Sequence, residues 1–509
     1  MLASWKHWRV ALSALAGAML PLSFAPLSAY PLALASTALF FLLIDAQRPG
    51  LAARCGFAFG FAAFLAGTYW LYISVHHFGK APLLVALPVM FGLIAFMAAW
   101  YALLAWMCAR WLNGSAVTRL LLAWPAAWVT VEWLRGWVAT GFPWLSLGYS
   151  QLDSPLAGFA PLAGVYGVSW AVALVAGGIL LSLLGEGRKQ RWLGLLVALV
   201  VWLGGGLLRS VPWTAPEGDP ALVMVAQGNV AQDMKWLPEQ RQPTLDLYRE
   251  LTLQNLDSEL IVWPEAALPN LVSEEREYLS EVWTRVQESG GALVLGVLRL
   301  EPQDWTVRNS LLALGEEPGF YDKRHLVPFG EFFPVPGFVR NWLRLLSLPY
   351  SDIEPGPFDQ AVLLAGRFRI APSICYEDAF GAEQRSFLPE ANLLVNISND
   401  AWFGDSVAPH QHLQMARMRA LESGRFLIRS TNTGVSAVVD NNGQVMARSP
   451  QFKVAALRSK VQLFTGATPY ILAGNAPVMA LALIAMLAGA LLGKKRRHPS
   501  RPAVTPNTG

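Results

Sequence analysis

Long apolar stretches dominate the first 208 residues of the chain and return once near its end. A stretch of about 20 apolar residues is long enough for an α-helix to cross a bilayer. Membrane-spanning helices are predicted near residues 9–26, 29–45, 53–75, 82–108, 118–136, 158–184, 191–208 and 470–492. The first stretch resembles a signal peptide because Lys6 and Arg9 precede it, but the dense spans behind it favour an uncleaved first helix.

Lysine and arginine are distributed unequally between the loops that join these spans. They gather in alternate loops, at Lys6 and Arg9, Arg48 and Arg54, Arg110 and Arg119, and Arg188, Lys189 and Arg191. The opposite loops carry little beyond Lys80 and Arg135. Because cytoplasmic loops hold the excess of basic residues, the first set of loops is predicted to be cytoplasmic. Seven spans then place the chain outside the membrane from about residue 209, and the eighth returns it to a basic cytoplasmic tail.

The segment from residue 220 to 465 has a different pattern and predicts a separate domain. Its charge is higher, no window is apolar enough to span a membrane, and helical patterns separate short runs typical of strands. The predicted strands are Leu222–Ala226, Leu260–Trp263, Ala292–Leu300, Ser310–Leu314, Phe368–Ile374, Leu393–Ile397, Phe426–Arg429 and Val435–Val439. The pattern indicates a mixed α/β domain outside the membrane.

Local signals mark the ends of helices and one turn in this domain. Ser273 is predicted to cap a helix whose first turn carries two glutamates, which suit the positive end of the helix dipole. A second helix is predicted at about 411–423, with Gly424 at its C-terminal stop. The run Asn441-Asn442-Gly443 predicts a hairpin turn.

Composition supports a membrane protein and excludes several kinds of partner. Hydrophobic residues make up 54% of the chain and charged residues 15%, whereas soluble proteins are about a quarter charged. The net charge of +4 is too small to suggest nucleic acid. The three cysteines, Cys55, Cys108 and Cys375, show no spacing of a disulfide framework or a zinc site.

A hexapeptide with reactive side chains, Ser373-Ile374-Cys375-Tyr376-Glu377-Asp378, ends one predicted strand. The strand would deliver Cys375 to a turn, where its side chain can face a cleft. A lone cysteine at a strand end is more often a small buried hydrophobe. Nucleophilic use also requires a nearby base, because the thiolate is the reactive form. Histidine is the usual base, so a pair of Cys375 with His325, His410 or His412 remains open.

Two further segments present charged side chains beside apolar residues. The strand Leu260–Trp263 stops at Pro264 and presents Glu265, where a carboxylate is as often a loop cap as a base. Lys323 lies in the mixed-charge run from Tyr321 to Glu331, and a lysine in such a run is normally solvated. The apolar turn at 326–329 beside it is unusual for a surface loop.

The loop predicted between the fifth and sixth spans, from Gly136 to Pro155, contains Phe142-Pro143-Trp144-Leu145. Aromatic residues suit the membrane interface. An interfacial anchor and a contact with substrate are equally open interpretations of this run.

Taken together, the segments around Glu265, Lys323 and Cys375 resemble the nitrilase (carbon–nitrogen hydrolase) superfamily, which uses Glu, Lys and Cys in this chain order on an α-β-β-α sandwich. Eight spans with such a domain between the seventh and eighth resemble the bacterial apolipoprotein N-acyltransferases. The similarity extends to three further runs, Gln227-Gly228-Asn229 followed by Lys235-Trp236, Tyr321 to Glu331, and Asn396 to Gly404.

This resemblance implies a ping-pong acyl transfer. Glu265 would take the proton of Cys375, whose thiolate would attack a phospholipid acyl ester and form a thioester. The α-amine of a lipoprotein's N-terminal diacylglyceryl-cysteine would then attack, and Lys323 would stabilise the oxyanion. The resemblance also implies that Glu331, Tyr376 and Glu377 matter, and that Trp236 lies on a mobile loop over the site.

The expected fold class is a polytopic α-helical membrane protein with eight transmembrane helices and an extracytoplasmic α/β nitrilase-like domain, an α-β-β-α sandwich. The expected divisions are transmembrane helices 1–7 at 1–208, a periplasmic catalytic domain at 220–465, helix 8 at 470–492 and a basic tail at 494–509. We expect a monomer in the bacterial inner membrane with both termini cytoplasmic. Its expected partners are a phospholipid donor, a diacylated apolipoprotein acceptor and membrane lipid, without cofactor, metal or nucleic acid.

Two other functions fit parts of the sequence. A membrane-tethered amidase or nitrilase would let water attack the thioester, although one span would be enough to tether a hydrolase. A transporter with an accessory external domain would require acidic residues within the membrane. Glu132 and Asp45 are the candidates for that role, so support for transport is thin.

Overall fold

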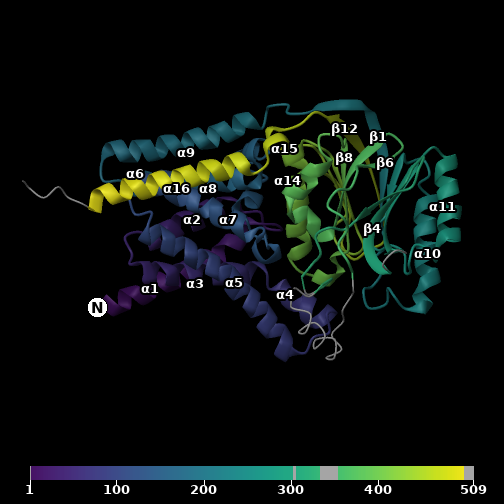
Figure 1. The fold of residues 1–509 in the computed structure, drawn as a ribbon, viewed down its shortest axis with the longest axis horizontal. Helices are drawn as coiled ribbons and strands as arrows, with labels where there is room; N and C mark the ends of the chain where they lie inside the picture. Colours follow the sequence, from purple (N-terminus) through teal and green to yellow (C-terminus); the bar gives the residue numbers. More distant parts are fainter. Residues whose placement is uncertain (1, 302–304, 329, 333–352, 498–509) are drawn as a thin grey trace, which may run out of the picture.

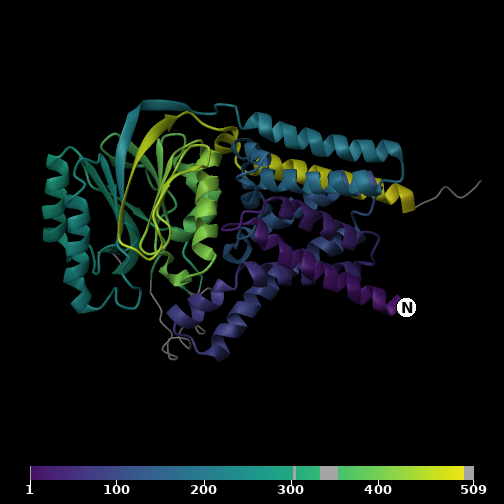
Figure 2. The ribbon, with the colours of Figure 1, turned by 180° about the vertical axis from the view of Figure 1, so that it is seen from behind.

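Two parts lie side by side in the computed structural model, a helical region and a sheet domain (Figure 1). The structure describes residues 2–301, 305–328, 330–332 and 353–497. Phe329 of the predicted apolar turn and residues 498–509 of the predicted tail lie outside the described residues. Seen from the front and from behind, the N-terminal end and the last turn of the C-terminal helix lie on the side of the helical region that faces away from the sheets (Figures 1 and 2).

Each of the eight stretches predicted to span a membrane falls on helix. The helical region comprises α1 (Leu2–Met19), α2 (Pro31–Ile44), α3 (Pro49–Gly67), α4 (Trp70–Tyr72), α5 (Leu83–Arg110), α6 (Ala116–Thr118), α7 (Trp124–Arg135), α8 (Ala160–Leu184), α9 (Arg188–Leu208), α15 (Pro469–Ala473) and α16 (Ala476–Arg497). Within the described residues, five helices are long and apolar enough to cross a membrane, namely α3, α5, α8 with the turn before it, α9 and α16. The protein is therefore a membrane protein with several apolar helices.

The helix boundaries differ from the predicted spans in several places, and the spans predicted at 53–75 and 470–492 are interrupted at Thr68 and Gly474. The α1 helix already begins at Leu2 and ends at Met19, where a short 3₁₀ turn replaces the predicted continuation to residue 26. The α2 helix has 14 residues, fewer than a full span requires. The α16 helix continues to Arg497, so the first basic residues assigned to the tail are helical.

The acidic residues considered for transport have structural partners. Glu132 on α7 accepts hydrogen bonds from the Trp128 indole at 2.8 Å and from the backbone N–H of Leu147 at 2.9 Å. Asp45 forms an ion pair with Arg119 at 2.8 Å. Both carboxylates thus join neighbouring segments of the helical region.

The sheet domain contains two six-stranded sheets within the described residues. One has the order β12-β1-β2-β3-β4-β5 and the other β11-β10-β9-β8-β7-β6. In each sheet three central strands run parallel, β1 with β2 and β3, and β7 with β8 and β9. The strands are β1 (Ala215–Gln227), β2 (Leu260–Val262), β3 (Ala292–Glu301), β4 (Thr306–Leu314), β5 (Gly319–Asp322), β6 (Leu363–Ala365), β7 (Phe368–Ile374), β8 (Leu393–Ser398), β9 (Leu427–Thr431), β10 (Ala437–Val439), β11 (Val445–Arg448) and β12 (Ala455–Thr465).

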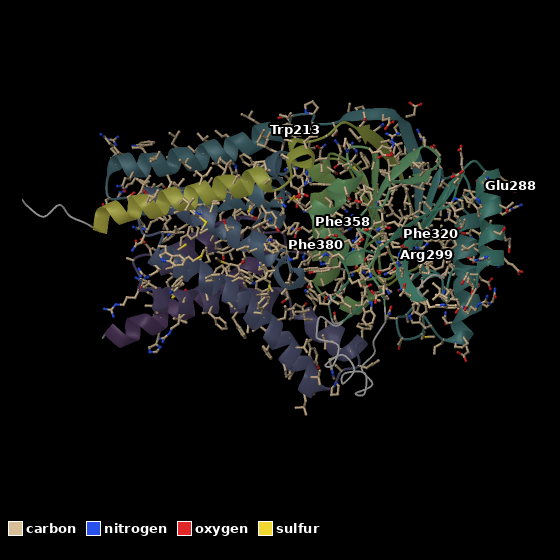
Figure 3. All side chains as sticks on the ribbon, in the orientation of Figure 1. Trp213, Glu288, Arg299, Phe320, Phe358 and Phe380 are labelled. Atoms are coloured by element: carbon tan, nitrogen blue, oxygen red, sulfur yellow. The ribbon has the colours of Figure 1, made fainter. Side chains whose placement is uncertain are left out.

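Helices cover the outer faces of both sheets, which gives the predicted α-β-β-α order. The α10 (Pro238–Leu253) and α11 (Arg276–Glu288) helices pack on the first sheet and lie farthest from the membrane helices, where Figure 3 labels Glu288. The short α13 helix (Gly381–Gln384) follows β7, and α14 (Ala408–Ser423) lies between the second sheet and the helical region (Figure 1). Gly424 ends α14 in the left-handed conformation, as predicted.

The α14 helix is buried on two opposite faces. Leu413, Ala416 and Ala420 belong to the apolar core between the sheets and α14, whereas Met415 and Met418 belong to the core of the helical region. Phe380, which Figure 3 labels at this boundary, also joins the helical core. The sheet domain is therefore packed directly onto the membrane helices.

One local prediction was wrong, and one of two open interpretations of the loop between α7 and α8 is disfavoured. The helix predicted to start after Ser273 begins at Arg276, and Glu275, which precedes it with a non-helical backbone, forms an ion pair with Arg241 at 2.7 Å. Trp144 and Leu145 do not anchor the protein at a lipid interface, since both are buried. Trp144 instead donates to Gln411 of α14 at 2.6 Å and joins the helical region to the sheet domain.

Candidate active site

Glu265 lies just beyond the C-terminal end of β2, as predicted. The turn lies against β3 at Gly296, where a Cβ atom would come within 2.5 Å of the Glu265 Cα. A glycine is therefore required for this close approach. The carboxylate is 7% exposed and accepts a hydrogen bond from Asn309 Nδ2 at 2.7 Å. Asn309 comes from β4, which β3 separates from β2, so two strands that are not adjacent fix the position of Glu265.

Lys323 directly follows β5 and is almost fully buried rather than solvated. Its Nζ lies 2.8 Å from Oε1 of Glu331 and 3.5 Å from Oε1 of Glu265. Burial opposes the charged form of Lys323, but the negative charges of Glu331 and Glu265 raise its pKa above the usual value. Lys323 is therefore held as an ammonium group between two carboxylates.

Cys375 is the first residue after β7, on the turn that the sequence predicts. Its backbone φ of 52° is in the left-handed region, which is uncommon for a residue with a side chain. Such strain persists only where the surrounding structure imposes it, and it often marks functional sites. Burial and the charge of Glu265 raise the pKa of the Cys375 thiol, while Lys323 acts in the opposite direction. A thiol in this environment needs a base to become a thiolate.

Glu377 connects the turn at Cys375 with the segment that carries Lys323. Its Oε2 accepts from the Ile374 N–H at 2.7 Å. Its Oε1 accepts from the backbone N–H groups of Arg324 at 2.7 Å and His325 at 3.1 Å, and from the Tyr321 hydroxyl at 2.9 Å. Burial raises the pKa of the Glu377 carboxyl. Its position indicates a structural role in holding two parts of the site together.

Glu331 and Tyr376 also lie in the site. Glu331 binds Lys323 through Oε1 and accepts from the Val327 N–H through Oε2 at 2.8 Å. The Tyr376 hydroxyl donates to the carbonyl of Gly141 at 3.2 Å, and its ring stacks with Trp144 at a centroid distance of 6.4 Å. The residue after Cys375 is therefore held by the loop between α7 and α8.

A buried charged cluster, which the sequence did not predict, lies beneath Cys375. His412 contacts Asp378 at 2.8 Å and Asp400 at 2.9 Å, and Arg429 pairs with the same two carboxylates at 2.8 and 3.0 Å. His412 Nε2 lies 3.1 Å from the backbone carbonyl of Cys375. These residues come from separate elements, and no local sequence pattern marks them as partners.

The sequence left three histidines open as the base for Cys375, and their surroundings in the structure test that possibility. Both ring nitrogens of His412 face aspartates and the Cys375 carbonyl, and the aspartates raise its pKa to about 9 against the effects of burial and Arg429. His325 is engaged with Glu383 at 2.8 Å and stacks on Phe380. Burial and the positive charge of Arg448 lower the pKa of His410. Among the charged groups that act on the Cys375 thiol, Glu265 and Lys323 have larger effects than Asp400.

Trp236 lies next to this site on a loop between β1 and α10. The Trp236 side chain is 47% exposed, and its neighbours Met234 and Leu237 are exposed to a similar degree. Lys235 between them is 2% exposed, and its Nζ donates to the main-chain carbonyl of Glu265 at 3.2 Å. An apolar surface is thus carried by a loop that contacts the turn of Glu265.

Comparison with known proteins agrees with this architecture. A family model for the apolipoprotein N-acyltransferase N-terminal domain matches residues 16–178, and one for carbon-nitrogen hydrolase matches residues 222–464. An apolipoprotein N-acyltransferase of Methylococcus capsulatus is 43% identical over 95% of this chain and 96% of its own length. Those of Azotobacter vinelandii and Pseudomonas aeruginosa are 43% and 41% identical, over 96% and 98% of both chains.

Among solved structures, a carbon-nitrogen hydrolase from Helicobacter pylori covers 53% of this chain and 94% of its own, at 15% identity and a TM-score of 0.37. Sequence identity of 43% over at least 95% of each chain, with the first two relatives, confirms the family expected from the sequence motifs. The chain belongs to the apolipoprotein N-acyltransferase family and is an enzyme that joins a helical membrane region to a carbon-nitrogen hydrolase domain.

Proposed function

We propose that this enzyme moves an acyl chain from a phospholipid to the α-amine of the N-terminal diacylglyceryl-cysteine of a lipoprotein, through a thioester on Cys375. The observation that carries the proposal is the placement of Lys323 between Glu265 and Glu331, beside a cysteine held on a strained turn. Membership of the family supplies the class of donor and acceptor. The reaction has two half-reactions that share one base and one oxyanion site.

In the first half-reaction, Glu265 takes the proton of the Cys375 thiol, and Sγ attacks the carbonyl carbon of the phospholipid ester. Lys323 and the backbone N–H of Tyr376 stabilise the oxyanion of the tetrahedral intermediate. When the C–O bond breaks, the lysophospholipid alkoxide takes the proton from Glu265, and the acyl group remains on Sγ. Because Glu265 becomes neutral when it accepts the proton, the charge of Lys323 is then less compensated and attracts the oxyanion more strongly.

In the second half-reaction, the amine of the acceptor attacks the thioester. Glu265 takes a proton from the attacking nitrogen, the C–S bond breaks, and the proton passes to the sulfur of Cys375. A thiolate is a good leaving group, so the amide forms and the free enzyme is restored. No cofactor or metal is needed in either step.

The supporting residues have separate tasks in this mechanism. Glu331 keeps Lys323 charged and oriented, because its ion pair with Lys323, at 2.8 Å, is shorter than that between Glu265 and Lys323, at 3.5 Å. Glu377 and Tyr376 hold the turn of Cys375 in place through the contacts described above. Trp236 covers the acyl chains from its loop, whose exposed apolar side chains suit contact with lipid.

We infer an arrangement of eight spans in the bacterial inner membrane, with the catalytic domain at 220–465 on the periplasmic side. Residues 1–208 supply seven spans, residues 470–492 the eighth, and residues 494–509 a cytoplasmic tail. The first turn of α1 and the last turn of α16, together with the basic turn between α8 and α9, lie away from the sheet domain (Figure 1), which supports cytoplasmic termini. The site then lies at the bilayer surface, where acyl chains need not enter water, and one copy of the chain contains all the residues assigned.

The experiment that tests the proposal is intact-mass analysis of the purified enzyme after incubation with phospholipid alone. We expect one added acyl mass, which hydroxylamine removes and which Cys375→Ala lacks. A diacylated lipopeptide should then discharge the adduct, whereas the same lipopeptide with an acetylated α-amine should not. Rapid loss of the adduct to free fatty acid without any acceptor would indicate a hydrolase, and the absence of an adduct on folded protein would refute the thioester mechanism.

A further inference from the structure

Lys235 is a buried lysine beside Glu265 that the mechanism above does not use. Its side chain is 2% exposed, and its Nζ donates to the main-chain carbonyl of Glu265 at 3.2 Å and lies 5.7 Å from the centre of the Trp236 ring. Burial lowers the pKa of Lys235 to about 8, and the charge of Glu265 opposes that decrease. Lysine is almost never buried to this extent unless it has a partner, because desolvation of the ammonium group is costly.

The segment that carries this lysine, residues 229–237, is referred to here as the Trp236 loop. Its first residues are fixed to the second sheet, because the N–H groups of Asn229 and Val230 donate to the backbone and side-chain oxygens of Asn432 at 2.8 and 2.9 Å. Its last residues expose Met234, Trp236 and Leu237. Lys235 is thus the inward-pointing residue within the exposed apolar end of the loop.

The turn that Lys235 contacts is itself strained. Ala266, directly after Glu265, has a φ of 46°, in the left-handed region. The neighbouring carbonyl of Pro264 accepts from the Gly296 N–H at 3.2 Å, and the Ala267 N–H donates to the Gly296 carbonyl at 2.9 Å. The Lys235 ammonium group binds the carbonyl between these two points. A strained turn needs such external contacts to persist, so the loop contributes to the position of the Glu265 carboxylate.

We propose that Lys235 is a positioning residue that fastens the Trp236 loop to the main chain of Glu265, so that loop closure over the acyl chains and placement of the base occur together. This inference rests on the proposed function, which assigns the base to Glu265. The negative charge of the Glu265 carboxylate also acts on the Lys235 ammonium group, so the two groups interact electrostatically as well as through the main-chain contact. Lys323 stabilises the oxyanion, whereas Lys235 holds the base, Glu265, in position.

The test measures the single-turnover rate constant for acylation of Cys375 by phospholipid as a function of pH and donor concentration. For Lys235→Met we expect a decrease at saturating donor of about tenfold to a hundredfold, the range that misplacement of a catalytic group produces. We also expect the acidic limb of the pH profile to move to higher pH by about one unit. Lys235→Arg, which keeps the positive charge and the donors, should leave that limb in its wild-type position. Lys460→Met, at an exposed lysine of β12, is the matched control and should match the wild type.

A residue that only stabilises the fold would lower the thermal midpoint without moving the pH profile. The inference is overturned if Lys235→Met retains the wild-type profile, or if Lys235→Arg shifts it equally. Hydrogen exchange in Lys235→Met provides a second measurement, in which amides at 231–237 and 265–267 should both exchange faster than in the wild type. Glu265→Gln separates the two proposals, because full acylation in that variant would overturn the role of Glu265 itself. Loss of acylation in Glu265→Gln together with unchanged acylation in Lys235→Met would overturn only the inference about Lys235.

Discussion

The buried cluster beneath Cys375 should make the stability of the catalytic domain depend on pH on the alkaline side of neutrality. His412 lies between Asp378 and Asp400, and these carboxylates raise its pKa from 6.5 to about 9 although burial and Arg429 act against the charged form. A histidine whose pKa is raised in the folded state stabilises the fold fully below its unfolded value, near 6.5. That contribution is lost as the pH rises through the folded value, near 9. The stability of the domain should therefore fall mainly between pH 6.5 and 9.5.

The size of the effect follows from the difference between the two pKa values. At about 1.4 kcal/mol per pKa unit, the change from 6.5 to about 9 corresponds to about 3 kcal/mol of stability. His412 is fully buried, so solvent screening does not reduce this contribution appreciably. In a domain of this size, 1 kcal/mol changes the midpoint of thermal unfolding by about 2–4 °C, which predicts a decrease of about 6–12 °C across the window.

The assay is thermal unfolding of the detergent-solubilised protein at a series of pH values, followed by intrinsic tryptophan fluorescence. His412→Gln should be less stable at pH 6.5 and should lose most of the alkaline dependence. His410→Gln is the matched control on the same helix, because burial lowers the pKa of His410 and its replacement should leave the alkaline decrease in place. A wild-type midpoint that stays constant from pH 6.5 to 9.5, or a His412→Gln variant with the wild-type slope, would refute a charged His412.

Three further substitutions test the contacts around the site. Glu331→Gln removes the carboxylate closest to Lys323 and should slow single-turnover acylation by on the order of 10²-fold, whereas a near wild-type rate would contradict the proposed role of that ion pair. Glu377→Gln turns one buried acceptor into a donor and should destabilise the protein by about 1–3 kcal/mol, seen as a lower unfolding midpoint. Gly296→Ala places a Cβ 2.5 Å from the Glu265 Cα and should slow acylation at least about tenfold, and full activity would show that the turn can shift without consequence.

The central strands could be predicted from the sequence because their signals are strong. β2 and β8 are buried on both faces and form nearly continuous apolar runs. β7 was predicted from the alternation of Phe368, Ile370 and Ile374 with other residues. Strands that the sequence did not predict are either short or half-exposed, such as β6 with three residues and β11, in which every second residue is exposed. The start of α11 was misplaced by two residues, since Glu274 and Glu275, expected in the first turn, precede the helix and Glu275 pairs with Arg241 of α10.

The site was partly predictable for a different reason. Glu265, Lys323 and Cys375 each have an ordinary explanation when taken alone, and it was their order along the chain that identified them together. Asn309 and the cluster around His412 could not be found in this way. Asp378, Asp400 and Arg429 come from separate elements, and only the fold brings their charges together with His412. Their burial as mutual partners has no local sequence pattern.

The helical region contributes directly to the site and does more than attach it to a membrane. The hydroxyl of Tyr376, the residue after Cys375, binds the carbonyl of Gly141 in the loop between α7 and α8. From the same loop, Trp144 stacks on Tyr376 and donates to Gln411 of α14, while α14 supplies His412 beneath Cys375. A hydrolase tethered by one span would have no use for such contacts. They fix the position of the thiol relative to the membrane helices, which is what a reaction between two membrane-bound substrates requires.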